Sequence, residues 1–171
     1  QALTIHHHLR NLRFQLFINF MEIFGPIPSR RLGRSLGINN IPPKSCSYSC
    51  TYCQVGAGAA TEIKRRGFYA PEYLFKLVDE RVTQARERGE IIDYLSFVPD
   101  GEPTLDTHLG DTIELLRPLG IKIAIISNGS LIWREEIRET LKKLDWVCLK
   151  VDTVTETIWH RLNKSHGNLK L

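Results

Sequence analysis

Three short apolar runs in the second half of the chain have the composition of β-strands. They cover residues 91–98, 121–126 and 146–151 and are rich in β-branched and aromatic side chains. A further strand is expected at residues 35–38, after an extended lead-in over residues 22–28 whose prolines disfavour helix. These runs do not alternate apolar and polar residues, so we expect the strands to be buried on both faces.

Amphipathic segments lie between these runs. Pro71 suits the first turn of a helix, and apolar residues recur at helical spacing until Gly89 ends the pattern. A weaker helix is expected at residues 111–116, and residues 156–162 begin another. A helix between these two carries four apolar residues, Trp133, Ile137, Leu141 and Leu144. Strand and helix in alternation predict an α/β fold in which parallel strands are joined by right-handed helical crossovers.

The first 20 residues differ from the rest of the chain. They combine His6, His7 and His8 with an apolar run that contains arginines, and Met21 is the only methionine. A natural start at Met21 explains both features, and an amphipathic helix that packs on the domain is the alternative. We therefore expect an N-terminal extension over residues 1–20 and one domain over residues 21–171.

The composition is that of an ordinary globular protein, with 42% hydrophobic and 25% charged residues. No apolar run approaches the length of a membrane span and no signal peptide is evident, so we expect a cytoplasmic protein without a membrane partner. The net charge of +4 is partly clustered on both sides of the cysteines, at Arg30, Arg31, Arg34, Lys64, Arg65 and Arg66. These groups could face an anionic substrate or RNA, although a solvated surface is the simpler interpretation.

Three cysteines, Cys46, Cys50 and Cys53, follow the first expected strand with CxxxCxxC spacing. Three thiolates can hold three corners of an iron–sulfur cube, which leaves one iron open to a small molecule. A zinc site would need a fourth ligand, whereas Cys148 lies in an apolar run and the histidines have no fixed spacing to the triplet. Disulfides are disfavoured in a reducing compartment. The cysteines alone therefore favour a cluster, with zinc or free thiols as alternatives.

Polar residues follow each of the later strands. These are Gly101, Glu102 and Pro103, then Ser127 and Asn128, then residues 150–152 with Lys150 and Asp152. Each group alone is an ordinary turn or helix cap. In parallel α/β folds, however, ligands bind at the carboxyl ends of the strands. We therefore expect these residues and the cysteine triplet to form one site.

These motifs resemble those of the radical S-adenosylmethionine (SAM) superfamily. That family has a CxxxCxxC loop after its first strand with an aromatic residue before the last cysteine, which is Tyr52 here. Its Gly-Gly-Glu motif after the second strand corresponds to Gly101 and Glu102, with Asp100 in place of the first glycine. More narrowly, residues 24–37 and Gln54 are similar to a group of poorly assigned prokaryotic iron–sulfur oxidoreductases, which are distantly similar to the wyosine-forming tRNA enzymes.

The resemblance implies that Cys46, Cys50 and Cys53 hold a 4Fe-4S cluster and that SAM chelates its open iron. Reductive cleavage of SAM would give methionine and a 5′-deoxyadenosyl radical that abstracts hydrogen from an unknown substrate, either RNA or a protein to be activated. An electron donor such as flavodoxin or ferredoxin is implied as a partner. The alternative from a different class is a non-catalytic iron–sulfur or zinc-binding electron-transfer module.

The resemblance also implies residues that bind SAM, while no residue is assigned as catalytic. Tyr52 would lie near the adenine, Glu102 would accept a hydrogen bond from the α-ammonium group, and Gly101 would let the backbone approach. Pro103 ends the same motif and is included among the expected SAM-binding residues. The ribose and carboxylate would be reached by Ser127, Asn128, Lys150 and Asp152. Family members usually have about six βα units, so the expected fold is a partial (βα) barrel of radical SAM type, truncated after about four units.

Overall fold

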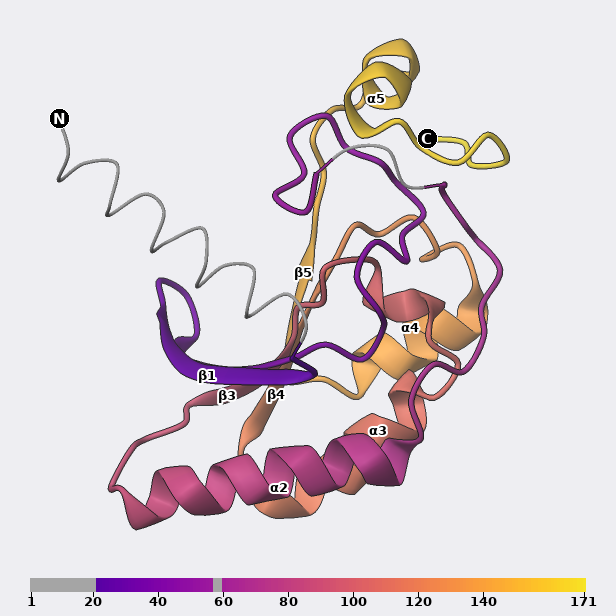
Figure 1. Ribbon diagram of the computed structural model, residues 1–171. Helices are drawn as coiled ribbons and strands as arrows, with labels where there is room; N and C mark the ends of the chain where they lie inside the picture. Colours follow the sequence, from indigo (N-terminus) through magenta and orange to yellow (C-terminus); the bar gives the residue numbers. More distant parts are fainter. Residues whose placement is uncertain (1–20, 57–59) are drawn as a thin grey trace, which may run out of the picture.

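The computed structural model describes residues 21–56 and 60–171, so the expected extension at residues 1–20 lies outside the described residues. Within the described ranges, five strands form one sheet in chain order (Figure 1). They are β1 Ile23–Ser29, β2 Gly33–Ile38, β3 Tyr94–Phe97, β4 Lys122–Ser127 and β5 Trp146–Leu149. Strands β2 to β5 are parallel, and β1 forms an antiparallel hairpin with β2. The expected α/β architecture is confirmed.

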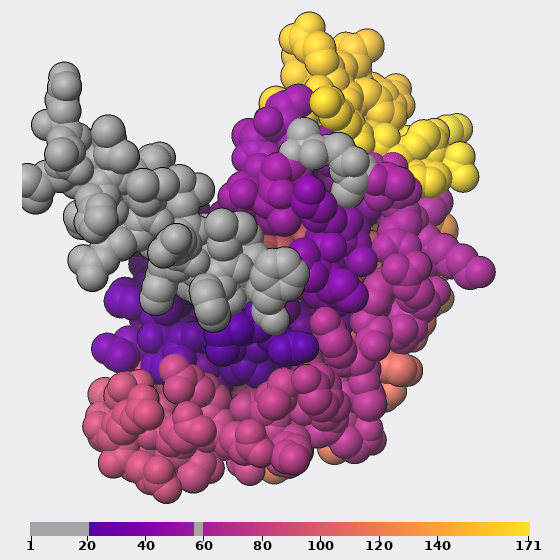
Figure 2. All heavy atoms as spheres, in the orientation of Figure 1, coloured from indigo at the N-terminus to yellow at the C-terminus, as the bar shows by residue number. Residues whose placement is uncertain are grey.

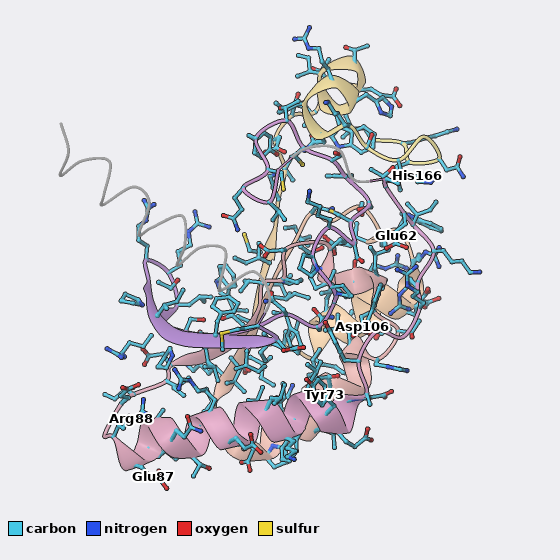
Figure 3. The ribbon with its side chains drawn as sticks, in the orientation of Figure 1. Glu62, Tyr73, Glu87, Arg88, Asp106 and His166 are labelled. Atoms are coloured by element: carbon cyan, nitrogen blue, oxygen red, sulfur yellow. The ribbon has the colours of Figure 1, made fainter. Side chains whose placement is uncertain are left out.

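Helices connect the parallel strands and cover one face of the sheet. They are α2 Pro71–Glu87, α3 Leu109–Leu116 and α4 Glu135–Lys142, with short 3-10 turns at Pro103–Leu105 and Arg117–Leu119. Helix α5 Glu156–Asn163 follows β5 and lies beyond the carboxyl end of that strand (Figure 1). The side chains of α2 that face away from the sheet, including Tyr73 and Glu87, project into solvent (Figure 3).

The hydrophobic core lies between the sheet and these helices. Apolar residues at alternate positions of β2, β3 and β4 pack against one face each of α2, α3 and α4. The fully buried members are Leu36, Ile38, Val78, Val82, Leu95, Phe97, Leu105, Leu109, Ile113, Leu116, Ile125 and Leu131. Burial of this kind contributes about 1.5–3 kcal/mol for each large side chain, so the core fixes how the strand ends are placed.

The lead-in before β2 is extended as expected and is itself a strand, because its backbone pairs with β2. Two other expectations from the hydrophobic pattern were wrong in detail. The helix expected to carry Trp133 begins only at Glu135, and Trp133 is 63% exposed. Burial on both faces does not hold for β5, whose residues alternate between half-buried and exposed. Strand β5 has a hydrogen-bonded partner on one side only within the described sheet, so less of it is covered.

The carboxyl and amino-terminal ends of the parallel strands form two opposite edges of the sheet, and different segments of the chain lie at each. The cysteine loop, residues 46–53, follows the carboxyl end of β2, and the segments after β3, β4 and β5 leave from the same edge. The β1–β2 turn lies at the opposite, amino-terminal edge. No helix in the described part of the chain is long and apolar enough to cross a membrane.

Candidate functional site

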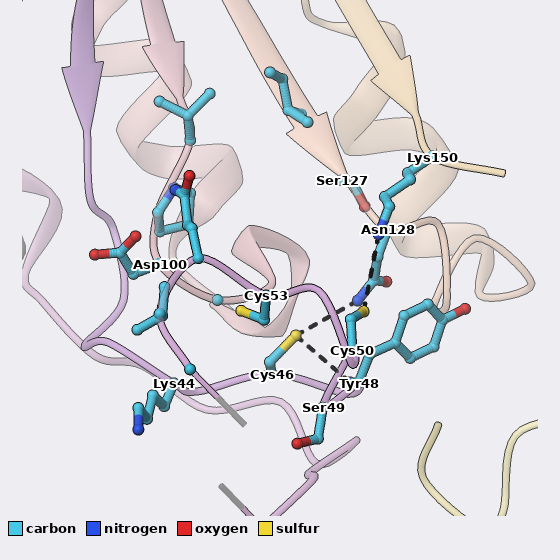
Figure 4. A pocket seen from close by; sticks show the side chains of 17 residues that line it. Lys44, Cys46, Tyr48, Ser49, Cys50, Cys53, Asp100, Ser127, Asn128 and Lys150 are labelled. Atoms are coloured by element: carbon cyan, nitrogen blue, oxygen red, sulfur yellow. Dashed lines mark hydrogen bonds between the residues drawn. The ribbon is translucent and has the colours of Figure 1, made fainter. Parts of the chain in front are cut away.

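A cavity of about 290 Å³ opens where the parallel strands end at their carboxyl edge (Figure 4). Its lining includes all three cysteines of the triplet. Further lining residues come from the three later strand ends and include Gly101, Ser127, Asn128 and Lys150. Cys46 and Lys150, 104 positions apart in the sequence, are therefore brought to one place, as the parallel topology predicts.

Gly101 allows the end of β3 to touch the cysteine loop. A Cβ atom at this position would lie 2.2 Å from the Ser45 carbonyl oxygen and 2.8 Å from Ile41 Cδ1. Backbone hydrogen bonds join the same segments, from Glu102 to the Ser45 carbonyl at 2.9 Å and from Lys44 to the Asp100 carbonyl at 2.7 Å. Glycine is required here because two backbones approach each other closely.

Glu102 is a buried carboxylate that joins the ends of β3 and β4. Its side chain is fully covered, with 1% of its surface exposed. Oε1 accepts hydrogen bonds from the Thr104 amide (3.1 Å), Thr104 Oγ1 (2.6 Å) and Ser127 Oγ (2.7 Å), and Oε2 accepts one from the Asn128 amide (2.7 Å). Burial raises the pKa of Glu102, and these four donors oppose the rise.

Asn128 carries this network on to the cysteine loop. Its Nδ2 donates to Ser47 Oγ at 2.9 Å and to Cys46 Sγ at 3.6 Å, and the Tyr48 amide donates to the same sulfur at 3.5 Å. Burial raises the pKa of the Cys46 thiol to about 12, and the charges of Glu102 and the other two cysteines add to the rise. A metal that bound Cys46 would therefore have to displace the thiol proton.

The end of α5 holds the other half of the loop (Figure 2). The Thr51 amide donates to the Leu162 carbonyl at 2.9 Å, and the Ser49 amide donates to the Asn163 carbonyl at 3.0 Å. Behind the loop, Trp159 packs edge-on against Tyr48 and donates to its hydroxyl at 3.2 Å. The cysteine loop is thus supported by strand ends on one side and by a helix end on the other.

A polar cluster surrounds Cys50 on the helix side. Tyr52 donates to Asp152 Oδ2 at 2.5 Å, and Lys150 Nζ lies 3.2 Å from the same carboxylate oxygen and 4.2 Å from the centre of the Tyr52 ring. Lys150 Nζ also contacts Tyr52 Oη and lies 3.8 Å from Cys50 Sγ. Burial disfavours the charge of Asp152, but hydrogen bonds from Tyr52, Asn163 and Lys150 outweigh it and lower the pKa of Asp152.

The predicted site residues separate into two groups. The three cysteines, Gly101, Ser127, Asn128 and Lys150 line the cavity. Glu102, Tyr52 and Asp152 are hydrogen-bonded to this lining from behind or beside it, and Pro103 is buried at the start of a 3-10 turn. Their roles toward a cofactor stay predictions.

Sequence reasoning missed Tyr48, Trp159 and Asn163, because nothing in the sequence marks the end of α5 as a neighbour of the cysteines.

The basic groups on either side of the cysteines do not meet at the site. Arg30 and Arg31 lie in the β1–β2 turn at the opposite edge of the sheet. Arg65 donates to the carbonyls of Thr104 and Asp106, and Arg66 pairs with Glu62. Most of these charges thus serve local structure or face solvent away from the cavity, which agrees with the simpler interpretation of the sequence.

The three cysteines of the triplet are not arranged as ligands of one metal ion. Within residues 21–56 and 60–171, no three His, Cys, Asp or Glu side chains are arranged to hold one metal ion. In an iron–sulfur cube each cysteine binds a different iron, so the three sulfurs need not converge on one point. Zinc requires ligands arranged tetrahedrally around one centre. The N–H donors to Cys46 Sγ also suit a metal-bound thiolate.

Comparison with known proteins identifies a protein family that this chain matches. The family model described as the Radical SAM superfamily matches residues 40–170, which includes every residue of the cavity. The UPF0026 protein MJ1312 of Methanocaldococcus jannaschii is 55% identical over 148 residues, covering 86% of this chain and 46% of that protein. The chain thus corresponds to somewhat less than half the length of this relative.

Two solved structures share the fold. TYW1, with a lysine-pyruvate adduct bound, has a TM-score of 0.54 at 15% identity, covering 78% of this chain and 47% of that one. SuiB of Streptococcus suis, bound to the precursor peptide SuiA, has a TM-score of 0.53 at 20% identity, covering 74% and 26%. These likenesses confirm the partial radical SAM-type fold expected from the sequence.

Proposed function

The chain belongs to the radical SAM superfamily, and we propose that Cys46, Cys50 and Cys53 hold a 4Fe-4S cluster that serves the reductive cleavage of SAM. The observation that carries the proposal is the single cavity lined by all three cysteines and by the ends of β3, β4 and β5. When bound, the cluster would supply the electron that cleaves SAM into methionine and a 5′-deoxyadenosyl radical, which takes hydrogen from the substrate.

The residues around the cavity would bind and orient SAM. Gly101 leaves room for backbone contact, and Asn128 and Lys150 present donors at the cavity wall. Ser127 and Asp152 would contribute further polar contacts. The ring of Tyr52, which is 48% exposed and held through its hydroxyl by Asp152 and Lys150, would lie against the adenine. Glu102 already accepts four hydrogen bonds from the protein. To bind the SAM ammonium group, one of its carboxylate oxygens must accept an additional hydrogen bond.

The substrate would reach the same edge of the sheet, and the electron would come from flavodoxin or ferredoxin. The arginines of the β1–β2 turn give no support for RNA, because they lie at the other end of the parallel strands. SuiB was solved with a precursor peptide, so a peptide or protein substrate belongs in the first assays beside RNA. Hydrogen abstraction by the SAM-derived radical is common to both choices.

Anaerobic reconstitution with iron and sulfide tests the proposal. We expect about four irons per chain in the wild type, and loss of the cluster in Cys46→Ser, Cys50→Ser and Cys53→Ser. Cys148→Ser is the matched control, because Cys148 does not line the cavity. Reduction with dithionite in the presence of SAM should release 5′-deoxyadenosine. Zinc in place of iron, or a cluster that survives loss of the triplet, would contradict the proposal.

A further inference from the structure

Asn163, the last residue of α5, is placed against one of the three cysteines. Its side chain is buried, with 1% of its surface exposed. Nδ2 lies 3.5 Å from Cys50 Sγ, 3.2 Å from Tyr52 Oη and 2.6 Å from Asp152 Oδ2. Asn163 is 113 positions from Cys50 in the sequence and belongs to no motif discussed above. A buried amide pointed at a candidate ligand requires a physical explanation.

The backbone of the same helix end holds Cys50 from both sides. The carbonyls in the last turn of a helix lack partners within the helix. Here the Leu162 carbonyl accepts from the Thr51 amide and Thr51 Oγ1, and the Asn163 carbonyl accepts from the Ser49 amide. Ser49 and Thr51 are the residues immediately before and after Cys50. The end of α5 therefore determines where the Cys50 sulfur points.

The orientation of the Asn163 amide is set by acceptors. Nδ2 carries two hydrogens and faces three acceptors, while Oδ1 is buried with no hydrogen-bond partner among the described residues. The reverse orientation would place an oxygen against the Asp152 carboxylate and the Cys50 sulfur, which is unfavourable because all three atoms carry negative charge. The donor therefore stays on the sulfur side.

We propose that Asn163 is a positioning residue that aims the Cys50 thiolate at the cluster and raises the reduction potential of the cluster by donating a hydrogen bond to that sulfur. This inference rests on the proposed function. Hydrogen bonds to the cluster sulfurs are one of the determinants of iron–sulfur potentials. The reduced cluster is the more negatively charged state, so a donor stabilises it more than the oxidised cluster. Loss of the donor lowers the potential.

The test is an EPR-monitored redox titration of the reconstituted wild type, Asn163→Leu and Asn163→Ser. Leucine matches asparagine in size, and serine is a smaller replacement should leucine prevent folding. Both variants should bind iron, have a more negative midpoint potential, and show a several-fold lower ratio of reduced to oxidised cluster at the wild-type midpoint. Asn168→Leu is the matched control, an exposed asparagine in the segment after α5, and its midpoint should equal that of the wild type.

The outcomes separate this inference from the proposed function. If Asn163→Leu or Asn163→Ser lowers the melting temperature but leaves the midpoint potential unchanged, Asn163 supports the loop only and the inference is overturned. A higher midpoint in either variant also overturns it. If the wild type takes up no cluster, the proposed function itself fails. An unchanged EPR response to SAM together with a lowered midpoint is the result expected when Asn163 acts on the sulfur rather than on the SAM pocket.

Discussion

Two sets of contacts hold the cysteine loop, one from the strand ends and one from the end of α5, and they differ in how far they are buried. On the strand side, Gly101, Glu102 and Asn128 connect the loop to the ends of β3 and β4 through buried contacts. On the helix side, α5 holds the loop by its terminal carbonyls, by Trp159 and by a partly exposed cluster around Lys150. Cys46 belongs to the first support and Cys50 to the second.

The difference indicates which contacts keep the cysteine loop in place and which contacts only alter the properties of the site. Buried polar groups with fixed partners are expensive to disrupt, because a donor that loses its acceptor cannot turn to water. On the helix side Trp159 and Asn163 are also buried, but the contacts of Tyr52 and Lys150 lie near solvent and are exchanged for water at smaller cost. Strand-side substitutions should therefore abolish cluster binding together with folding stability, and helix-side substitutions should leave a cluster whose properties are altered.

Replacement of Glu102 should break the strand-side support most severely. Glu102→Ala removes the acceptor of four hydrogen bonds and leaves Thr104, Ser127 and Asn128 with unpaired buried donors. We expect a loss of about 3 kcal/mol in the free energy of unfolding, measured by urea denaturation, and little iron after reconstitution. Glu87→Ala, an exposed glutamate of α2, is the control and should change neither (Figure 3). A stable Glu102→Ala protein that binds iron normally would show that the strand-side network is dispensable.

The second-largest effect is expected when a methyl group is added at Gly101. Gly101→Ala places Cβ 2.2 Å from the backbone oxygen of Ser45, immediately before the cysteine loop, so the loop or the strand end must move. The expected cost is about 1–3 kcal/mol in unfolding free energy, with a reduced iron content. Gly167→Ala has open space around the new methyl group and should behave as the wild type in both measurements. Equal behaviour of the two variants would mean that the loop tolerates displacement.

Trp159→Phe tests the helix side. The change keeps an aromatic ring against Tyr48 but removes the indole donor to the Tyr48 hydroxyl. We expect a loss of about 1 kcal/mol in unfolding free energy, faster amide hydrogen exchange in α5, and full iron content. If this variant loses the cluster as completely as Gly101→Ala does, the two supports are equivalent and the comparison fails.

The smallest effect is expected at the opposite edge of the sheet. Arg30→Gln with Arg31→Gln removes two exposed charges from the β1–β2 turn, which lies away from the cavity. Iron content and the response of the cluster to SAM should equal those of the wild type. RNA binding at low salt, measured by filter retention, should be weak in both proteins. Strong wild-type binding that disappears in the variant would assign an RNA-binding role to this edge.

The sequence predicted the strand ends well and the helix end not at all. Gly101, Ser127, Asn128 and Lys150 were expected at one site because parallel strands align their carboxyl ends, and this follows from strand order alone. The contact between Asn163 and Cys50 depends on where α5 packs, and no local pattern encodes that. The burial of Glu102 was missed for a similar reason, because two of its four donors come from Ser127 and Asn128, which only the fold brings to it.

The central claim is that the cavity at the cysteine loop holds a cluster with one iron open to SAM. Electron paramagnetic resonance of the reduced, reconstituted protein with and without SAM tests it most directly. We predict a 4Fe-4S signal whose shape changes when SAM is added. A cluster signal indifferent to SAM would contradict the claim and identify the site as an electron-transfer centre.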